Sequence, residues 1–273
     1  MILPSEIARA GYRLWALERT GSTNQDAMDA ARAGDPGRLW VTAREQKTGR
    51  GRHGRTWSSP PGNLYASLLL VAPCSLAAAP QLGFVAGLAL HDAVSSVTGI
   101  TWPHLALKWP NDLLLQEAKV SGLLLEAQIL APERVAIVIG FGVNVADAPN
   151  DTPYRTTALN RVDHSATAEA VFCCLARSFE QQFTAWQTAH RSGSDAFGPV
   201  REAWLARAAA LGQEIGVRVG PRNLTGTFLG LDAIGRLLIE TREGLETIDA
   251  GDLFWPSLRN ISGDIQSPDE VTI

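Results

Sequence analysis

Residues 46–57 read Gln-Lys-Thr-Gly-Arg-Gly-Arg-His-Gly-Arg-Thr-Trp and are the most informative segment of the 273-residue chain. The segment holds three glycines with the G-x-G-x-x-G spacing of dinucleotide-binding loops, at Gly49, Gly51 and Gly54. Such a loop requires a helix directly after the glycines and an acidic residue about 20 residues further on. Here residues 58–62 are Ser-Ser-Pro-Pro-Gly, and positions 46–91 contain no Asp or Glu. The segment therefore does not predict a Rossmann nucleotide site.

Three arginines, Arg50, Arg52 and Arg55, share this segment with the glycines. Glycine lets the backbone approach a ligand closely, and a guanidinium group offers carboxylate or phosphate oxygens a planar fork of donors. A solvated basic loop, or a phosphate contact to nucleic acid, would have a similar composition. Because the arginines, the glycines and Trp57 lie within so few residues, capture of a small anion is favoured. Composition alone leaves the alternatives open.

A second unusual segment is Leu107-Lys108-Trp109-Pro110-Asn111-Asp112. Proline favours an extended conformation for the residue before it and removes one backbone donor. Lys108 is therefore expected at the end of a strand, beside a turn. The alternatives are an ordinary surface lysine and, for Asn111 with Asp112, an Asx-type turn.

The chain is mildly acidic, with 24 Lys and Arg against 28 Asp and Glu and a formal net charge of −4. This balance argues against a general nucleic-acid coat, which needs a basic face. No apolar run is long enough to span a membrane, and the N-terminus lacks the apolar core of a signal peptide. Three cysteines, Cys74, Cys173 and Cys174, do not form a disulfide framework. These features predict a globular, cytoplasmic protein.

Apolar periodicity predicts a large mixed unit followed by a small β unit. The predicted helices span 24–33 (after a Ser22 or Thr23 cap), 82–98, 165–191 and 196–211. The predicted strands are 39–43, 64–71 and a hairpin of 120–127 with 135–140. After Gly212, short runs at 215–219, 224–231, 237–241 and 246–249 favour a small β-barrel. The expected organisation is a catalytic unit over 1–211, a β-barrel over 212–259 and a disordered tail over 260–273.

Taken in order, several segments resemble the biotin–protein ligases, of the monofunctional type without an N-terminal DNA-binding domain. The resemblance is carried by Ser22-Thr23-Asn24, Gln46, Gly49 to Trp57 (the family's G-R-G-R-x-G-R-x-W), Lys108 to Asp112 (K-W-P-N-D), Lys119 to Glu126, and Gly140 to Asn144. It covers most of the chain to about residue 145. The fold that it implies is α+β: a mixed sheet with packed helices, like that of class II synthetases and biotin–lipoate ligases, plus a C-terminal SH3-like β-barrel.

The resemblance implies two half-reactions, with biotin and ATP as substrates and Mg²⁺ accompanying ATP. The biotin carboxylate attacks the α-phosphorus of ATP to form biotinyl-5′-AMP, and a lysine of a biotin carboxyl carrier domain then takes the biotinyl group. Two like charges about 4 Å apart repel by ~1 kcal/mol in water and ~4 kcal/mol at an effective dielectric of 20. Fixed cations are therefore needed where the two anions meet. No protein metal site, DNA or membrane partner is expected, and the family contains both monomers and homodimers.

The family positions assign a role to each matching residue. Catalysis is assigned to Lys108, Arg52 and Arg50. Biotin binding is assigned to Ser22, Thr23, Asn24, Gln46, Gly49, Arg50, Gly51, Arg52, Lys108 and Gly122. ATP binding is assigned to Arg52, Arg55, Trp57, Lys108, Asn111 and Asn144.

Two other functions are weighed against this one. A lipoate or octanoyl transferase has a similar fold, but the arginine-glycine loop and K-W-P-N-D belong to the biotin branch. A biotin-responsive DNA-binding repressor would need a helix-turn-helix unit, and only about twenty residues precede Ser22. We therefore expect a ligase that does not bind operator DNA.

Overall fold

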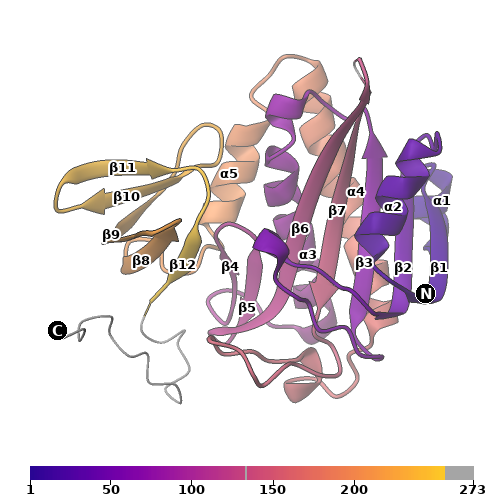
Figure 1. Ribbon diagram of the computed structural model, residues 1–273, viewed down its shortest axis with the longest axis horizontal. Coiled ribbons are helices and arrows are strands. Elements are labelled where there is room, and N and C mark those ends of the chain that lie inside the picture. Colours follow the sequence, from indigo (N-terminus) through magenta and orange to yellow (C-terminus); the bar gives the residue numbers. More distant parts are fainter. Residues whose placement is uncertain (133, 256–273) are drawn as a thin grey trace, which may run out of the picture.

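The computed structural model describes residues 1–132 and 134–255, and a seven-stranded mixed sheet is its main element (Figure 1). The strand order is β1-β2-β3-β7-β6-β5-β4. The strands are β1 (Arg13–Thr20), β2 (Leu39–Gln46), β3 (Leu64–Val71), β4 (Leu105–Lys108), β5 (Asp112–Leu115), β6 (Ala118–Ala131) and β7 (Arg134–Val143). β1 and β2 run parallel, and every other neighbouring pair is antiparallel. The expected mixed sheet and the β6–β7 hairpin are confirmed.

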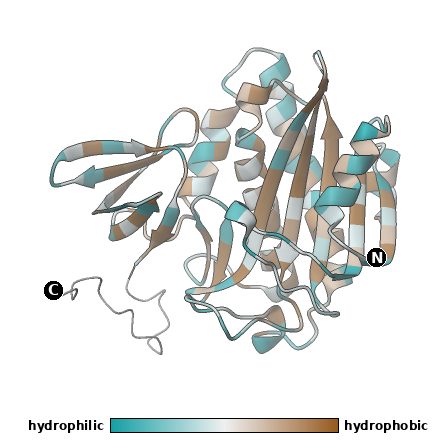
Figure 2. Cartoon of the chain, viewed as in Figure 1, coloured by the Kyte–Doolittle hydropathy of each residue, from teal (hydrophilic) through white to brown (hydrophobic). Residues whose placement is uncertain are grey.

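Helices cover both faces of the sheet. α2 (Thr23–Arg32) packs on one face with Leu39, Leu69 and Val138. The other face meets α3 (Gln81–Thr98) and α4 (Ala168–Arg191), with the short α1 (Ser5–Arg9) beside α4. Figure 2 shows the central strands hydrophobic along most of their length, as expected when both faces are buried.

The predicted helix ends are confirmed for α2 and α3. Gly34 follows α2 with φ +98°, and Gly99 follows α3 with φ +70°, the left-handed backbone that glycine adopts without a steric penalty.

The last predicted helix is wrong at its C-terminal end. α5 (Phe197–Leu205) stops well before residue 211. The segment after it runs beside β4 instead: Leu107 N donates to Arg207 O at 2.8 Å, and Ala209 N donates to Leu107 O at 2.7 Å. These bonds satisfy the edge of β4, which explains why the chain leaves the helix.

A second sheet follows, with the order β11-β10-β9-β8-β12. Its antiparallel strands are β8 (Glu214–Val219), β9 (Arg222–Leu231), β10 (Leu237–Thr241), β11 (Gly244–Ile248) and β12 (Asp252–Phe254). The edge strands β11 and β12 do not pair, so within the described residues this sheet is open and not the closed barrel expected. β12 pairs with β8 and forms the edge of the second sheet that lies nearest the large sheet (Figure 1).

Three further predictions concern a membrane span, disulfides and the C-terminal tail. No helix in the described ranges is long and apolar enough to cross a membrane. All three cysteines are free. The predicted tail, 260–273, lies outside the described residues.

Candidate functional site

The arginine-glycine loop connects β2 to β3 and folds back on itself. Gly51 N donates to Arg55 O at 2.7 Å, and Trp57 N donates to Gly49 O at 2.9 Å. A Cβ atom on Gly49 would lie 2.6 Å from Trp57 O and from the Ser59 hydroxyl, so only glycine fits there. These two backbone hydrogen bonds and the tight space at Gly49 define the shape of the loop.

The three loop arginines have different partners. Arg50 lies 3.4 Å from Gln25 Oε1 and 3.9 Å from a carboxylate oxygen of Glu126. Arg52 donates to Asn111 Oδ1 and to Gly251 O, each at 3.3 Å. The third, Arg55, forms an ion pair with Asp252 of β12.

Arg52 and Arg55 thus reach the second sheet. The pKa values of both arginines are shifted in these surroundings. Burial lowers the pKa of Arg52, while the carboxylates of Asp252 and Asp112 oppose that shift. Burial alone would raise the pKa of Asp252, but the hydrogen bonds and charge of Arg55 bring it below its ordinary value. The same contact raises the pKa of Arg55, so Arg55 and Asp252 each favour the charged form of the other.

A buried carboxylate lies between two lysines next to this loop. Asp112 is the cross-strand partner of Lys108, whose Nζ lies 3.5 Å from it. Lys119 Nζ, from β6, lies 2.7 Å from the other oxygen. Burial lowers the pKa of Lys108 and Asp112 opposes that shift. Burial would raise the pKa of Asp112, but the two ammonium groups hold it below its usual range. With both lysines protonated, the cluster carries a net positive charge.

The Trp57 indole lies over a pair of glycines that face each other across β6 and β7. Gly122 and Gly142 are register partners. A Cβ atom on Gly142 would lie 2.5 Å from the Trp57 ring, and one on Gly122 would lie 3.2 Å from it. Lys119 Nζ is 5.5 Å from the Trp57 ring centroid and 5.3 Å from that of Tyr154, within cation–π range.

A neutral, buried group of polar side chains lies at the start of α2. Thr23 donates to Gln46 Oε1 from its backbone N at 2.9 Å and from its hydroxyl at 3.1 Å. Gln46 Nε2 donates to the Ser59 hydroxyl at 3.0 Å. Ser67 donates to Thr23 Oγ1 at 2.7 Å and to Asn24 Oδ1 at 2.6 Å. The single hydroxyl hydrogen of Ser67 can be donated to one of these acceptors at a time, so Ser67 links two residues predicted to bind biotin.

Ser22 takes the N-cap position of α2, but its side chain makes no capping bond. The helix-cap alternative for this serine is therefore not supported, although its backbone carbonyl accepts from Asp26 N. Ser22 is buried at the edge of the neutral group.

Two predicted ligand contacts are already engaged with the protein. Asn24 Nδ2 donates to Glu126 at 2.7 Å, and a Cβ atom on Gly140 would lie only 2.2 Å from Asn24 Oδ1. Asn144 is buried and donates to Thr157 O at 3.1 Å. Their side chains bridge secondary-structure elements around the site.

The structure thus divides the predicted residues between two regions. The neutral region holds Ser22, Thr23, Asn24 and Gln46. The cationic region holds Arg52, Arg55, Lys108, Asn111, Trp57 and Gly122, while Gly49, Arg50 and Gly51 lie in the loop that joins the two.

Sequence reasoning gave no role to several residues that complete these regions: Ser67, Asp112, Lys119, Glu126 and Asp252. Lys119 had a usable signal, because it is a charge at the start of an otherwise apolar run. Asp252 had none, because its contact with Arg55 spans 197 residues.

Comparison with known proteins identifies the fold and the family. A model of the biotin/lipoate A/B protein ligase family matches residues 16–144, and a model of the biotin protein ligase C-terminal domain matches residues 210–254. The chain is 40% identical over 245 residues to the biotin--[acetyl-CoA-carboxylase] ligase of Paracoccus denitrificans, covering 88% of this chain and 99% of the relative. The chain belongs to the biotin protein ligase family.

Other relatives and solved structures agree. A bifunctional ligase/repressor BirA of Bacillus subtilis is 32% identical over 89% of this chain and 74% of the relative. Among solved structures, the Aquifex aeolicus biotin protein ligase in complex with biotin and ATP aligns with a TM-score of 0.73 at 29% identity, over 89% of this chain and 97% of that chain. The resemblance drawn from the motifs, and the ligase class, are therefore confirmed.

Proposed function

We propose that this protein activates biotin with ATP to biotinyl-5′-AMP and transfers the biotinyl group to a lysine of a biotin carboxyl carrier domain. The observation that carries the proposal is the meeting of Arg52, Lys108 and Lys119 around Asp112, beside a neutral polar group. The relatives support it, since they are named biotin--[acetyl-CoA-carboxylase] ligases or are solved with biotin and ATP.

The neutral region is suited to the uncharged head of biotin. A ureido ring has one carbonyl and two N–H groups, each unfavourable to bury without a partner. Thr23 and Gln46 offer hydroxyl and amide groups that are held by Ser67 and Ser59, and the buried Ser22 precedes Thr23 in the chain. The head would therefore meet partners that need little reorganisation.

The cationic region is suited to the reacting anions. A carboxylate oxygen of biotin forms a bond to the α-phosphorus of ATP, and the bond to the departing pyrophosphate breaks. Arg52 and Lys108 would offset the charge that accumulates there, and Lys119 joins them because it shares Asp112 with Lys108. No side-chain nucleophile is required, because the substrate carboxylate already serves as one.

In the second half-reaction, the carrier lysine attacks the anhydride carbonyl, an amide forms and AMP leaves. Trp57 would provide a flat surface for the adenine ring, seated by Gly122 and Gly142. Arg55 would meet phosphate by exchanging its bond to Asp252 for one to the nucleotide.

Mg²⁺ is proposed to enter with the phosphates of ATP. No group of three or more His, Cys, Asp or Glu side chains in residues 1–132 and 134–255 could hold a metal ion. The two carboxylates nearest the cations, Asp112 and Asp252, are themselves ion-paired. The donor set therefore does not form a metal site of its own, and no step is assigned to the metal.

The test is a two-substrate assay. Purified protein with biotin, MgATP and a biotin carboxyl carrier domain should release pyrophosphate and add one biotinyl group to the carrier, as detected by mass spectrometry. Lipoate in place of biotin should give no product. Transfer of lipoate alone would reassign the substrate to the lipoate branch.

Two expectations stay predictions: that the protein does not bind operator DNA, and that it is located in the cytoplasm. A footprinting assay at physiological salt would test the first.

A further inference from the structure

A recess lies at the opposite end of the sheet from the arginine-glycine loop. It has a volume of about 270 Å³ and is bounded by the starts of β1 and β2, the end of β3 and the C-terminal half of α4. The loop follows the other end of β2, and eight strand residues separate the two, a distance of roughly 20–25 Å. The recess is therefore separate from the proposed ligase site, and its function goes beyond the proposed one.

One wall of the recess is a stripe along α4. Phe183, Gln187 and Arg191 are spaced four residues apart, so they lie on the same face of the helix. Phe183 is buried, Gln187 is half-buried and Arg191 is exposed. The wall changes along its length from apolar to amide to cationic.

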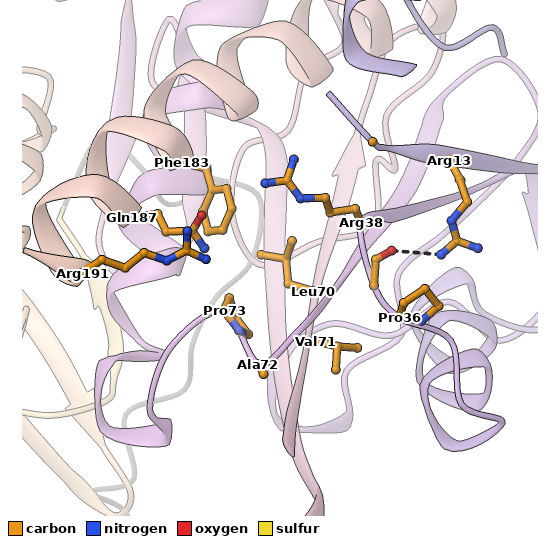
Figure 3. Close-up of a pocket in the computed structure, with 12 residues that line it drawn as sticks. Arg13, Pro36, Arg38, Leu70, Val71, Ala72, Pro73, Phe183, Gln187 and Arg191 are labelled. Atoms are coloured by element: carbon orange, nitrogen blue, oxygen red, sulfur yellow. Dashed lines mark hydrogen bonds between the residues drawn. The ribbon is translucent and has the colours of Figure 1, made fainter. Parts of the chain in front are cut away.

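The opposite wall carries Arg38. Figure 3 shows Arg38 and Arg191 extending from opposite sides toward the space above Leu70. Leu70 and Phe183 close the base of the recess and are almost wholly buried, while Val71 beside them is half-buried and Ala72 is exposed, so the accessible floor is apolar. The recess therefore joins an apolar floor to a rim with two cations.

The charges at this end of the sheet are not balanced. Arg13 is neutralised by Asp35, with bonds of 2.9 and 2.6 Å. Arg38 donates to Ala10 O at 2.6 Å, lies 4.9 Å from the Tyr12 ring centroid, and among the described residues pairs with one carboxylate, that of Glu180, at 3.8 Å.

Glu180 is shared, because it also accepts from the Tyr12 hydroxyl at 2.6 Å. The side chain of Arg191 forms no hydrogen bond or ion pair with any residue in the described ranges. An excess positive charge thus faces the recess in a chain whose net charge is −4.

The backbone around the recess is held in an uncommon conformation. Arg38 and Ala72 carry side chains at φ +52° and +49°, and Gly37 lies at φ +93°. A Cβ atom on Gly37 would come within 2.7 Å of Val71 N, so the β1–β2 side of the recess and the end of β3 are in close contact. Left-handed backbone at residues with side chains is uncommon and clusters at binding sites.

We propose that this recess binds a small carboxylate with a compact apolar body. The carboxylate would lie between Arg38 and Arg191, and the apolar body would rest on Val71 and Ala72. Guanidinium groups bind carboxylates with paired, charge-assisted hydrogen bonds, and the apolar floor distinguishes such a ligand from a free inorganic anion.

The experiment titrates 3-phenylpropanoate, and separately inorganic phosphate, into ¹⁵N-labelled protein. The expected result is saturable shifts of the amide signals of Gly37 and Ala72 with 3-phenylpropanoate and none with phosphate. Biotin with ATP should not displace the probe. Arg191→Gln should weaken binding about tenfold, the effect of losing one charge-assisted contact, while the exposed control Arg161→Gln should leave it unchanged.

Three results would overturn the proposal: no saturable shift with 3-phenylpropanoate, displacement of the probe by biotin, or equal binding by Arg191→Gln and the wild type. A response to phosphate alone would overturn the apolar part and with it the proposed ligand class. The proposed ligase function is tested separately by pyrophosphate release, so the two can fail independently.

Discussion

The two regions of the proposed ligase site hold their side chains in opposite ways. The neutral region around Thr23 and Ser67 is built from short hydrogen bonds among buried, uncharged groups. The cationic region is built from ion pairs, and Arg52 and Arg55 are bound to the second sheet through Gly251 and Asp252. The first can recognise an uncharged ring without rearrangement. The second can exchange protein oxygens for phosphate oxygens.

The largest effect is expected from Arg52→Ala. Loss of one fixed cation at the reacting groups should lower the rate of biotin-dependent pyrophosphate release by about 10²–10³-fold. The melting temperature should change little, because Arg52 makes only two hydrogen bonds, both at 3.3 Å. Arg44→Ala is the matched control, since Arg44 is exposed at the end of β2. An unchanged rate in Arg52→Ala would remove this residue from the chemistry.

Asp112→Asn should act on stability as well as on rate. Removing one partner from a buried ion-paired group typically destabilises by about 3 kcal/mol or more. The folded pKa of Asp112 lies below the unfolded value of about 3.9, so its contribution is present above that pH and is lost as the pH falls through the folded pKa.

Denaturant unfolding of wild type and Asp112→Asn should therefore differ strongly at pH 7 and less at pH 3. Asp151→Asn, an exposed change, is the control and should show no difference at either pH. A gap for Asp112→Asn that is the same at both pH values would contradict the ion-pair account.

Ser67→Ala tests the neutral region. The change removes the hydrogen that Ser67 donates to Thr23 and Asn24, so the KM for biotin should rise about tenfold while the KM for ATP stays the same. Ser96→Ala is the control, because its hydroxyl bonds only to a backbone oxygen of its own helix. Equal changes in both KM values would mean that the two regions are not separate.

The smallest effect is expected from Asp252→Asn. Arg55 would lose its charged partner and become less ordered, so we expect a rise of a few-fold in the KM for ATP and no change in the KM for biotin. Steady-state kinetics with each substrate varied in turn measure both. A change confined to biotin would show that the second sheet supports the other region.

The sequence predicted those features that depend on neighbouring residues. α2 and α3 follow from apolar spacing and terminal glycines, and Lys108 was expected at a strand end before Pro110, where the structure has it. Features that depend on register were not predicted. The Trp57 ring packs against Gly122 and Gly142, where a Cβ atom would come too close to it. The register between β6 and β7 places these two glycines opposite each other.

Long-range competition explains the remaining differences. The helix predicted to residue 211 stops at Leu205 because the segment after it pairs with the edge of β4. The biotin contact of Asn24 stays a prediction, but the bond from its amide to Glu126, between residues 102 positions apart, could not be predicted. Such pairings leave no local pattern in the chain.

The central claim is that the loop arginines exchange their protein partners for ATP phosphates while the neutral region keeps its hydrogen bonds. A crystal structure with biotin and a non-hydrolysable ATP analogue tests this most directly. The account predicts Arg52 and Arg55 bonded to phosphate oxygens, Arg55 released from Asp252, and the bonds among Thr23, Gln46 and Ser67 retained. A complex in which both guanidinium groups stay on Gly251 and Asp252, away from either ligand, would contradict it.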